Sequence, residues 1–333
     1  MRGLMAAELL RMRKRRSLQV IVLAVPLLVA AFFFLGYQGI YEPPPFDAVQ
    51  YREQLIADGY TVGLPPEEAD QLLDQEVANA ETNDAMWRES IALQRATFLF
   101  PYSLVTVLGY ATFMLLALVL LVATTMGDEF GWATIRTTLL ANSHRWRVLL
   151  VRLLALVVAA TLILALLLII GTVLPVVLNV ASGRLPPTLP AFDWGALMLL
   201  LGGLLLASVA VIGLASLATL MVRSGALTLV AVLVYVVVEA AFLVFLLRFE
   251  PFQYDQDGKL GELAWLLEAF PVRGLATMTF ALGHAASGLP QYYQEAVVRD
   301  VAPAGLPMLS LTIFAAVFLG LAFRRFGRMD IVE

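Results

Sequence analysis

The sequence has no cysteine, only two histidines and few charged residues of any kind. Without cysteine, the chain has no disulfide, no thiolate metal site and no cysteine nucleophile. Charged residues make up 14 % of the chain, whereas soluble domains contain about 25 %. Hydrophobic residues make up 60 %, more than a water-soluble fold of this length can bury. We therefore expect an all-α integral membrane protein that crosses the bilayer several times.

The sequence also lacks the patterns of common enzyme classes. Its two lysines, Lys14 and Lys259, do not belong to a glycine-rich phosphate-binding loop, so we expect no ATP hydrolysis by this chain alone. His144 and His284 are predicted on opposite sides of the membrane, which excludes a shared metal ion or catalytic pair. Zinc-protease and serine-hydrolase motifs are absent. We predict no catalytic residue, no metal site, no bound cofactor and no nucleic-acid partner.

Six apolar runs are long enough to cross a hydrocarbon core of about 30 Å, which takes about 20 helical residues. They are continuous rather than alternating, and backbone groups find no water in lipid, so we predict helices and not a barrel. Pro175 is predicted to mark the frayed end of the third run. The first run is longer than a secretory signal core and is predicted to be a retained anchor. The predicted spans are residues 18–36, 103–126, 148–180, 195–220, 225–247 and 305–323.

The distribution of charge predicts the orientation in the cell membrane. Basic residues gather before the first run, between the second and third runs and after the last run, whereas residues 37–102 carry twelve acidic residues. Basic segments stay in the cytoplasm, so both termini are predicted to be cytoplasmic. The predicted parts outside the spans are an N-terminal segment (1–17), an extracytoplasmic helical region (37–102), a cytoplasmic segment (127–147), an extracytoplasmic or re-entrant region (248–304) and a cytoplasmic tail (324–333). The third to fifth spans lie within residues 148–247.

The cytoplasmic segment 127–147 is longer and more patterned than a connection needs. Asp128 and Glu129 stand where a helix would begin, Trp132 and Leu139 fall on one apolar face, and Arg145 suits the negative end of a helix. The pattern predicts a short amphipathic helix along the membrane surface. Such a helix can serve only as a lipid anchor. The two acids argue against that interpretation, because an anionic leaflet repels them, and they favour a protein partner with basic residues.

This segment resembles the coupling segment of the type-2 ABC-exporter permease family. The six-span plan, the basic N-terminal segment and the two outer regions are also similar, so the resemblance covers nearly the whole chain. The matching residues in the segment and at the next span are Glu129, Ala133, Thr134, Arg136, Leu139, Leu140, Arg145 and Arg152.

The resemblance implies a permease subunit that pairs with a second permease subunit and docks on separate cytosolic ABC ATPase subunits, which use ATP and Mg²⁺. The N-terminal segment would be an elbow helix among membrane lipids, with Leu4, Leu9 and Met12 toward the lipid. The same resemblance implies a set of ATPase-coupling residues: Asp128, Glu129, Trp132, Thr134, Arg136, Leu139 and Arg145.

Glu239 is the only carboxylate well inside a predicted span, with Tyr235 one turn before it. A charge at that depth costs about 2.5–3.5 kcal/mol on insertion scales, so the side chain should face protein or water. Two interpretations stay open: a polar point in a substrate or gating path, and a structural carboxyl bonded to a neighbouring span. In the family the second and fifth spans line the path. The resemblance therefore implies five path residues: Thr106, Tyr110, Thr124, Tyr235 and Glu239.

Two functions from other classes also stay open. One is a membrane anchor or interaction protein that presents the extracytoplasmic helices to a partner. The other is a membrane-embedded transferase, which would need a histidine and an acid close together near the membrane. The sequence does not predict which molecule is exported.

Overall fold

The computed structural model describes residues 2–40, 44–131, 145–182, 191–246, 248, 267, 269–288 and 305–328. These residues form helices and no strand, which confirms the predicted all-α class. Six helices are long and apolar enough to cross a membrane, so the chain is a multi-pass membrane protein. The six are Leu18–Gln38, Ala111–Phe130, Arg145–Val180, Trp194–Val222, Gly225–Leu246 and Gly305–Gly327.

The helices follow the predicted order, with a separate short helix before the first span. The described elements are α1 (Arg2–Lys14), α2 (Arg16–Gln38), α3 (Ala48–Ala57), α4 (Pro66–Ala96), α5 (Tyr102–Gly109), α6 (Ala111–Val122), the π-helix η1 (Ala123–Gly127), α7 (Asp128–Gly131), α9 (Arg145–Ser182), α10 (Trp194–Val222), α11 (Gly225–Leu246), α12 (Pro271–Ser287) and α14 (Gly305–Gly327).

Two details of the spans differ from the sequence prediction. The second span is interrupted at Tyr110, and beyond residue 126 the helical backbone continues through η1 into α7, whose first residue is Asp128. Helix α9 continues through Pro175 to Ser182. A proline removes one helical hydrogen bond. Leaving the helix in an apolar run would strand several backbone groups, which costs more.

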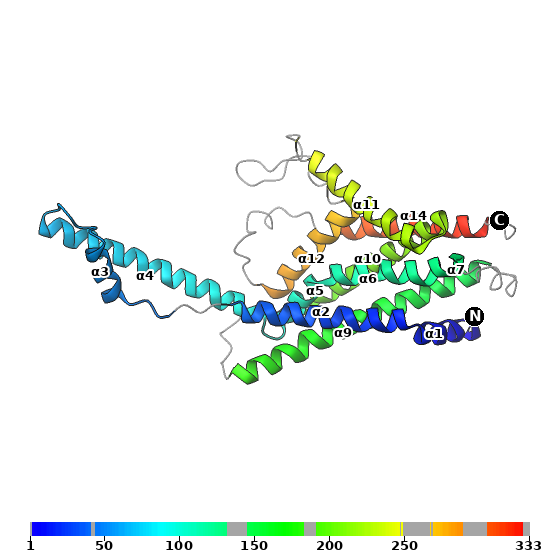
Figure 1. Ribbon diagram of the computed structural model, residues 1–333, viewed down its shortest axis with the longest axis horizontal. Helices are drawn as coiled ribbons and strands as arrows, with labels where there is room; N and C mark the ends of the chain where they lie inside the picture. Colours follow the sequence, from blue (N-terminus) through cyan, green and yellow to red (C-terminus); the bar gives the residue numbers. More distant parts are fainter. Residues whose placement is uncertain are drawn as a thin grey trace.

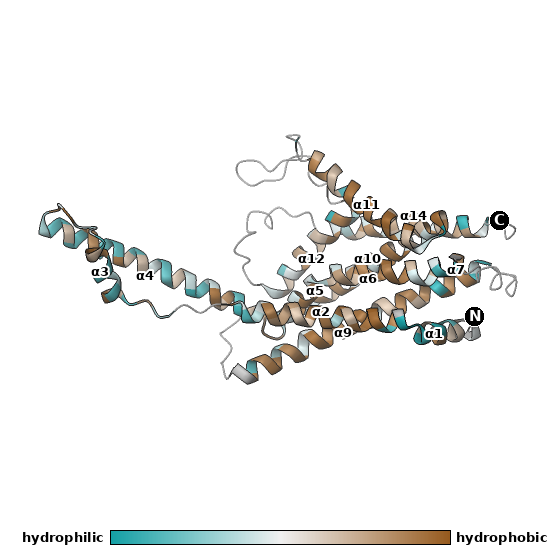
Figure 2. Ribbon diagram, viewed as in Figure 1, coloured by the Kyte–Doolittle hydropathy of each residue, from teal (hydrophilic) through white to brown (hydrophobic). Residues whose placement is uncertain are grey.

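The spanning helices lie side by side in one bundle (Figure 1). Both chain termini, α1 and α7 lie at one end, here called the terminal end, and α3 and α4 project from the other, the stalk end (Figure 1). Helix α10 is central, since it packs against α6, α9, α11, α12 and α14. The spanning helices are mainly apolar, and the projecting helices mainly polar (Figure 2).

The long helix of the stalk, defined as α3 and α4, begins at a proline that is followed by two acidic residues. Pro66 is at the first position of α4, and Glu67 and Glu68 lie in the first turn. Proline loses nothing there, because that N–H has no helical acceptor, and the acids suit the positive helix end. The helix therefore begins where its residue types favour a helix start.

Ion pairs fasten α3 to α4. The Arg52 guanidinium lies 2.9 Å from carboxylate oxygens of both Asp70 and Asp74. The Tyr60 hydroxyl donates to Glu76, and this hydrogen bond to the carboxylate raises the pKa of Tyr60 above its ordinary value. These contacts are exposed, so each contributes little to stability, and together they set the direction in which α3 folds back.

The region between the fifth and sixth spans contains a 17-residue helix, α12, which is too short to count among the spans. It packs against α10, α14 and α5. A side chain at Gly203 of α10 would collide with Met278 of α12 at 2.3 Å, so the two helices are in close contact. Residues 249–266 and 289–304 of this region lie outside the described part of the chain.

Two glycines bring the second and fifth spans together at the terminal end. A Cβ atom at Gly127 would lie 2.4 Å from the Cα of Gly225, and one at Gly225 would lie 2.6 Å from the carbonyl oxygen of Ala123. Backbone meets backbone at this point, so no flexible side chain is available to move aside. Only glycine fits at either position.

We predict that Gly127→Ala or Gly225→Ala destabilises the bundle, because overpacking costs about 1–3 kcal/mol even where side chains can adjust. The measurement is the midpoint of thermal unfolding in detergent. Gly202→Ala and Gly320→Ala are the matched controls, since a Cβ at either position meets nothing within 4 Å. Equal midpoints for the two pairs of variants would contradict the close contact.

Candidate functional site

Glu129 lies at the terminal end of the bundle, on α7, and is only 3 % exposed. It stands there because η1 and α7 extend the second span without a break. A carboxylate buried at such a position needs charged partners, since an uncompensated buried charge is strongly unfavourable.

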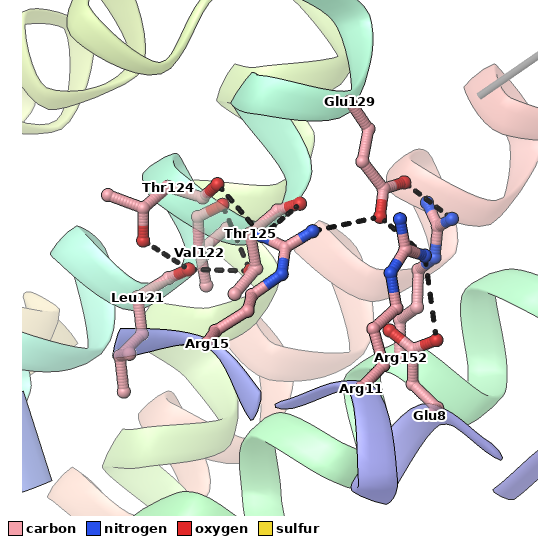
Figure 3. A network of polar contacts seen from close by, with 9 residues as sticks. All are labelled: Glu8, Arg11, Arg15, Leu121, Val122, Thr124, Thr125, Glu129 and Arg152. Carbon is pink, nitrogen blue, oxygen red and sulfur yellow. Dashed lines mark hydrogen bonds and ion pairs between the residues drawn. The ribbon is translucent and has the colours of Figure 1, made fainter. Parts of the chain in front are cut away.

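Three arginines, from α1, from its junction with α2 and from α9, surround the Glu129 carboxylate (Figure 3). Its Oε2 lies 2.5 Å from Nη2 of Arg152, at the start of α9. Its Oε1 lies 3.0 Å from Nη1 of Arg11 on α1 and 3.4 Å from Nη2 of Arg15. Glu8 adds a second carboxylate, 3.9 Å from Arg11. We call these five side chains the arginine cluster.

Arg15 also binds the backbone of the second span. It stands between α1 and α2, and its Nη1 donates to the carbonyl oxygens of Thr124 and Thr125, at 3.2 and 3.3 Å (Figure 3). Both carbonyls belong to η1. A π-turn shifts the hydrogen-bond register from i+4 to i+5, which disturbs the regular pairing of carbonyls and often marks a functional site. Arg15 satisfies carbonyls in this irregular turn.

The arginine cluster joins the two ends of the segment between the second and third spans. Glu129 precedes the segment and Arg152 follows it, so their ion pair closes the segment at its base. Arg11 and Arg15 add the N-terminal helix to the same unit. The arginine cluster therefore links α1, the second span and the third span.

The Arg152 guanidinium has N–H groups without a hydrogen-bond partner among the described residues. It is 5 % exposed, and within the described residues its Nε and Nη1 have no hydrogen-bond partner. The ion pair with Glu129 compensates the buried charge of Arg152. Loss of either partner would leave the other charge uncompensated, although the pair itself adds little net stability.

The predicted coupling residues divide into three groups. Asp128 is exposed and Arg145 is half-buried at the first position of α9. Glu129 is buried, so its basic partners come from its own chain and its carboxylate is not on the surface. Trp132, Thr134, Arg136 and Leu139 lie outside the described residues. The coupling role of all seven stays a prediction.

The N-terminal helix differs from the expected elbow in one respect. Met12, which was expected toward the lipid, is buried in the hydrophobic core with 5 % exposure. The reason is that the arginine cluster holds α1 against α9. The side chains of Leu4 and Leu9 lie outside the described residues.

The five predicted path residues do not form one surface. Thr106 lines a cavity near the stalk end. The Tyr110 ring stacks on Phe32 and Phe113, away from that lining. Thr124 lies at the opposite end of the span, where its carbonyl accepts from Arg15. Tyr235 and Glu239 lie on α11.

Glu239 makes a structural contact. It is 5 % exposed, and its Oε1 accepts a 2.6 Å hydrogen bond from the backbone N–H of Val272, in the first turn of α12. A carboxylate suits the positive end of a helix and satisfies an N–H that has no helical partner. The contact agrees with the interpretation of Glu239 as a structural carboxyl. Val272 lines the cavity, so Glu239 also positions one cavity wall.

Sequence reasoning missed the partners of Glu129. The arginines at residues 11 and 15 were read as orientation signals or as parts of an elbow helix, which their clustering equally favours. Arg15 and Glu129 are 114 positions apart. One signal was available in the sequence, because a carboxylate close to the end of a long apolar run needs a basic partner nearby.

A scan against protein-family models found no match for this chain, and searches of curated proteins and of solved structures found no significant similarity.

We predict that Glu129→Gln lowers the free energy of unfolding by about 3 kcal/mol, because removing one partner of a buried pair leaves the other charge uncompensated. Asp128→Asn is the matched control, since the neighbouring carboxylate is exposed. Thermal unfolding in detergent measures both. Adding Arg152→Leu to Glu129→Gln should recover part of the loss. If the two single variants unfold at the same temperature, Glu129 does not pair as described.

We predict that Glu239→Leu loosens the first turn of α12, since Val272 loses its acceptor. Hydrogen exchange of the amides at 272–275 should accelerate about fivefold, which corresponds to a hydrogen bond worth about 1 kcal/mol. Glu239→Gln keeps an acceptor oxygen and should show a smaller change. Unchanged exchange in Glu239→Leu would show that the carboxylate does not hold this turn.

Proposed function

We propose that this chain is the permease subunit of an ATP-binding-cassette exporter in the cell membrane, with both termini in the cytoplasm. It forms a path for an exported molecule together with a second permease subunit. Cytosolic ABC ATPase subunits, which carry ATP and Mg²⁺, supply the energy. The segment between the second and third spans is the ATPase-docking element.

The observation that carries the proposal is the arginine cluster. A docking element transmits force only if it is fixed to the helices that must move. The Glu129–Arg152 pair holds both ends of the segment, and Arg11 and Arg15 add α1. From there, the contact between Gly127 and Gly225 connects η1 to the fifth span. Docking at residues 132–144 would therefore act on four helices at once.

The terminal end also carries residues that are typical of the cytoplasmic membrane surface. Trp146 is 50 % exposed, and the Arg147 guanidinium lies 5.4 Å from the centre of its ring. Arginine and tryptophan are frequent at the headgroup level, where the ring is partly in lipid and the charge meets lipid phosphates. These two residues support a cytoplasmic position for this end.

The proposal is tested by co-purification with the cytosolic ABC ATPase encoded beside the gene. We expect a stable complex that hydrolyses ATP, and no hydrolysis by the isolated chain. Arg136→Glu should weaken the complex at least about tenfold, which corresponds to about 1.4 kcal/mol. Arg325→Glu is the control, because it makes the same charge change on the exposed end of α14. ATP hydrolysis by the chain alone, or equal binding by both variants, would contradict the proposal.

The stalk favours a second candidate function, a membrane anchor that presents α3 and α4 to an extracytoplasmic partner. Helix α4 has 31 residues, projects from the bundle and carries Trp87 with 60 % exposure (Figure 1). Replacing residues 48–80 with a short flexible linker distinguishes the two functions. An exporter subunit should keep its ATPase complex after this change, whereas an anchor should lose its extracytoplasmic partner and have no ATPase to keep.

A further inference from the structure

A cavity of about 600 Å³ lies near the stalk end, within a single chain. One wall is the interrupted outer part of the second span, α5 and the start of α6, and the other wall is α12. Leu204 of α10 and Leu115 of α6 complete it. The volume falls in the range of small-molecule sites, about 300–1,000 Å³. None of the residues that line it is charged.

Two threonine hydroxyls on opposite walls have no hydrogen-bond partner among the described residues. Threonines elsewhere in the spanning helices, such as Thr161 and Thr312, donate to the carbonyl four residues earlier. Within the described part of the chain, Thr112 and Thr279 make no such bond, although both line the cavity. For Thr112 the cause is the interruption at Tyr110, which puts the residue four positions earlier on a different helix.

The two walls are held at a fixed separation. A Cβ at Gly283 of α12 would lie 2.8 Å from Val105 of α5, so the helices are in close contact beside the cavity. At the other end of α12, Val272 is bonded to Glu239. The Gly283–Val105 contact prevents α12 from approaching α5 further. Movement of α12 away from α11 would break the hydrogen bond between Val272 and Glu239. The space is therefore a preformed site.

We propose that this cavity binds an uncharged amphipathic molecule, with an apolar body and an ester or hydroxyl group. The apolar walls match the body and exclude a charged group, which would lose its hydration without gaining a partner. Thr112 and Thr279 donate to the polar group from opposite sides. The binding site is argued from the cavity alone. Its second part, that the bound molecule is the exported cargo, rests on the proposed function.

Photoaffinity labelling tests the binding site. The isolated full-length chain is placed in phosphatidylcholine nanodiscs with a monoacylglycerol that carries a diazirine on its acyl chain, and labelled peptides are identified by mass spectrometry. Label should concentrate on α5, α6 and α12. Thr112→Val with Thr279→Val should raise the half-saturating concentration at least fivefold, since each lost hydrogen bond is worth about that factor. Ala276→Trp, which fills the cavity, should abolish saturable labelling.

The control is Thr161→Val with Thr312→Val, which removes two hydroxyls bonded within their own helices. It should label like the unaltered chain, and thermal unfolding shows whether each variant is folded. Equal labelling in all folded variants would overturn the proposal. So would label spread evenly over the lipid-facing helices, or tighter binding of an anionic probe with the same acyl chain.

A second measurement separates cargo from a resident lipid. With the ATPase complex in the same nanodiscs, a cargo should raise ATP hydrolysis at the concentration that saturates labelling. Saturable labelling without stimulation overturns the cargo assignment and supports the site. Failure to form an ATPase complex contradicts the proposed function, and the labelling result remains a separate test.

Discussion

The burial of one carboxylate, Glu129, determines how the terminal end of the molecule is built. A charge with 3 % exposure needs compensation, and Arg11, Arg15 and Arg152 supply it from α1, its junction with α2, and α9. The pairing draws three parts of the chain together that hydrophobic packing alone would not orient. It adds polar specificity to a bundle whose other contacts are mostly apolar, and it brings Glu129 and Arg152, which flank residues 132–144 in the sequence, into contact.

The stalk end depends on a contact of the same kind. Glu239 holds the start of α12 through Val272, and the Gly283–Val105 contact holds its other end near α5. At the terminal end, Gly127 and Gly225 bring the second and fifth spans into backbone-to-backbone contact. Movement at the terminal end would therefore reach α11, and through Glu239 the helix that forms one cavity wall. Two carboxylates and one glycine contact thus connect the proposed docking element to the proposed binding site.

Hydropathy predicted all six spans, because a long apolar run has no stable arrangement in lipid other than a helix. It did not predict the interruption at Tyr110 or the continuation of the helix past Gly127, because neither changes the average hydropathy of the run. The continuation explains why Glu129 was placed on a surface and found in the interior. Partners such as Arg15 and Glu129, or Glu239 and Val272, are set by how the helices pack, which local patterns do not encode. Of the five predicted path residues, Thr106 is the one that lines the cavity.

The central claim is that α1 and the start of the docking segment move as one unit. Because the chain has no cysteine, two introduced cysteines can be spin-labelled specifically. Spin labels at positions 13 and 128, where Arg13 and Asp128 are both exposed, report the separation of α1 and α7. The distance is measured by double electron–electron resonance in the ATPase complex. The account predicts the same distance with and without ATP, and a broader distribution when Glu129 is replaced by Gln. A distance that changes on ATP binding in the unaltered chain would contradict it.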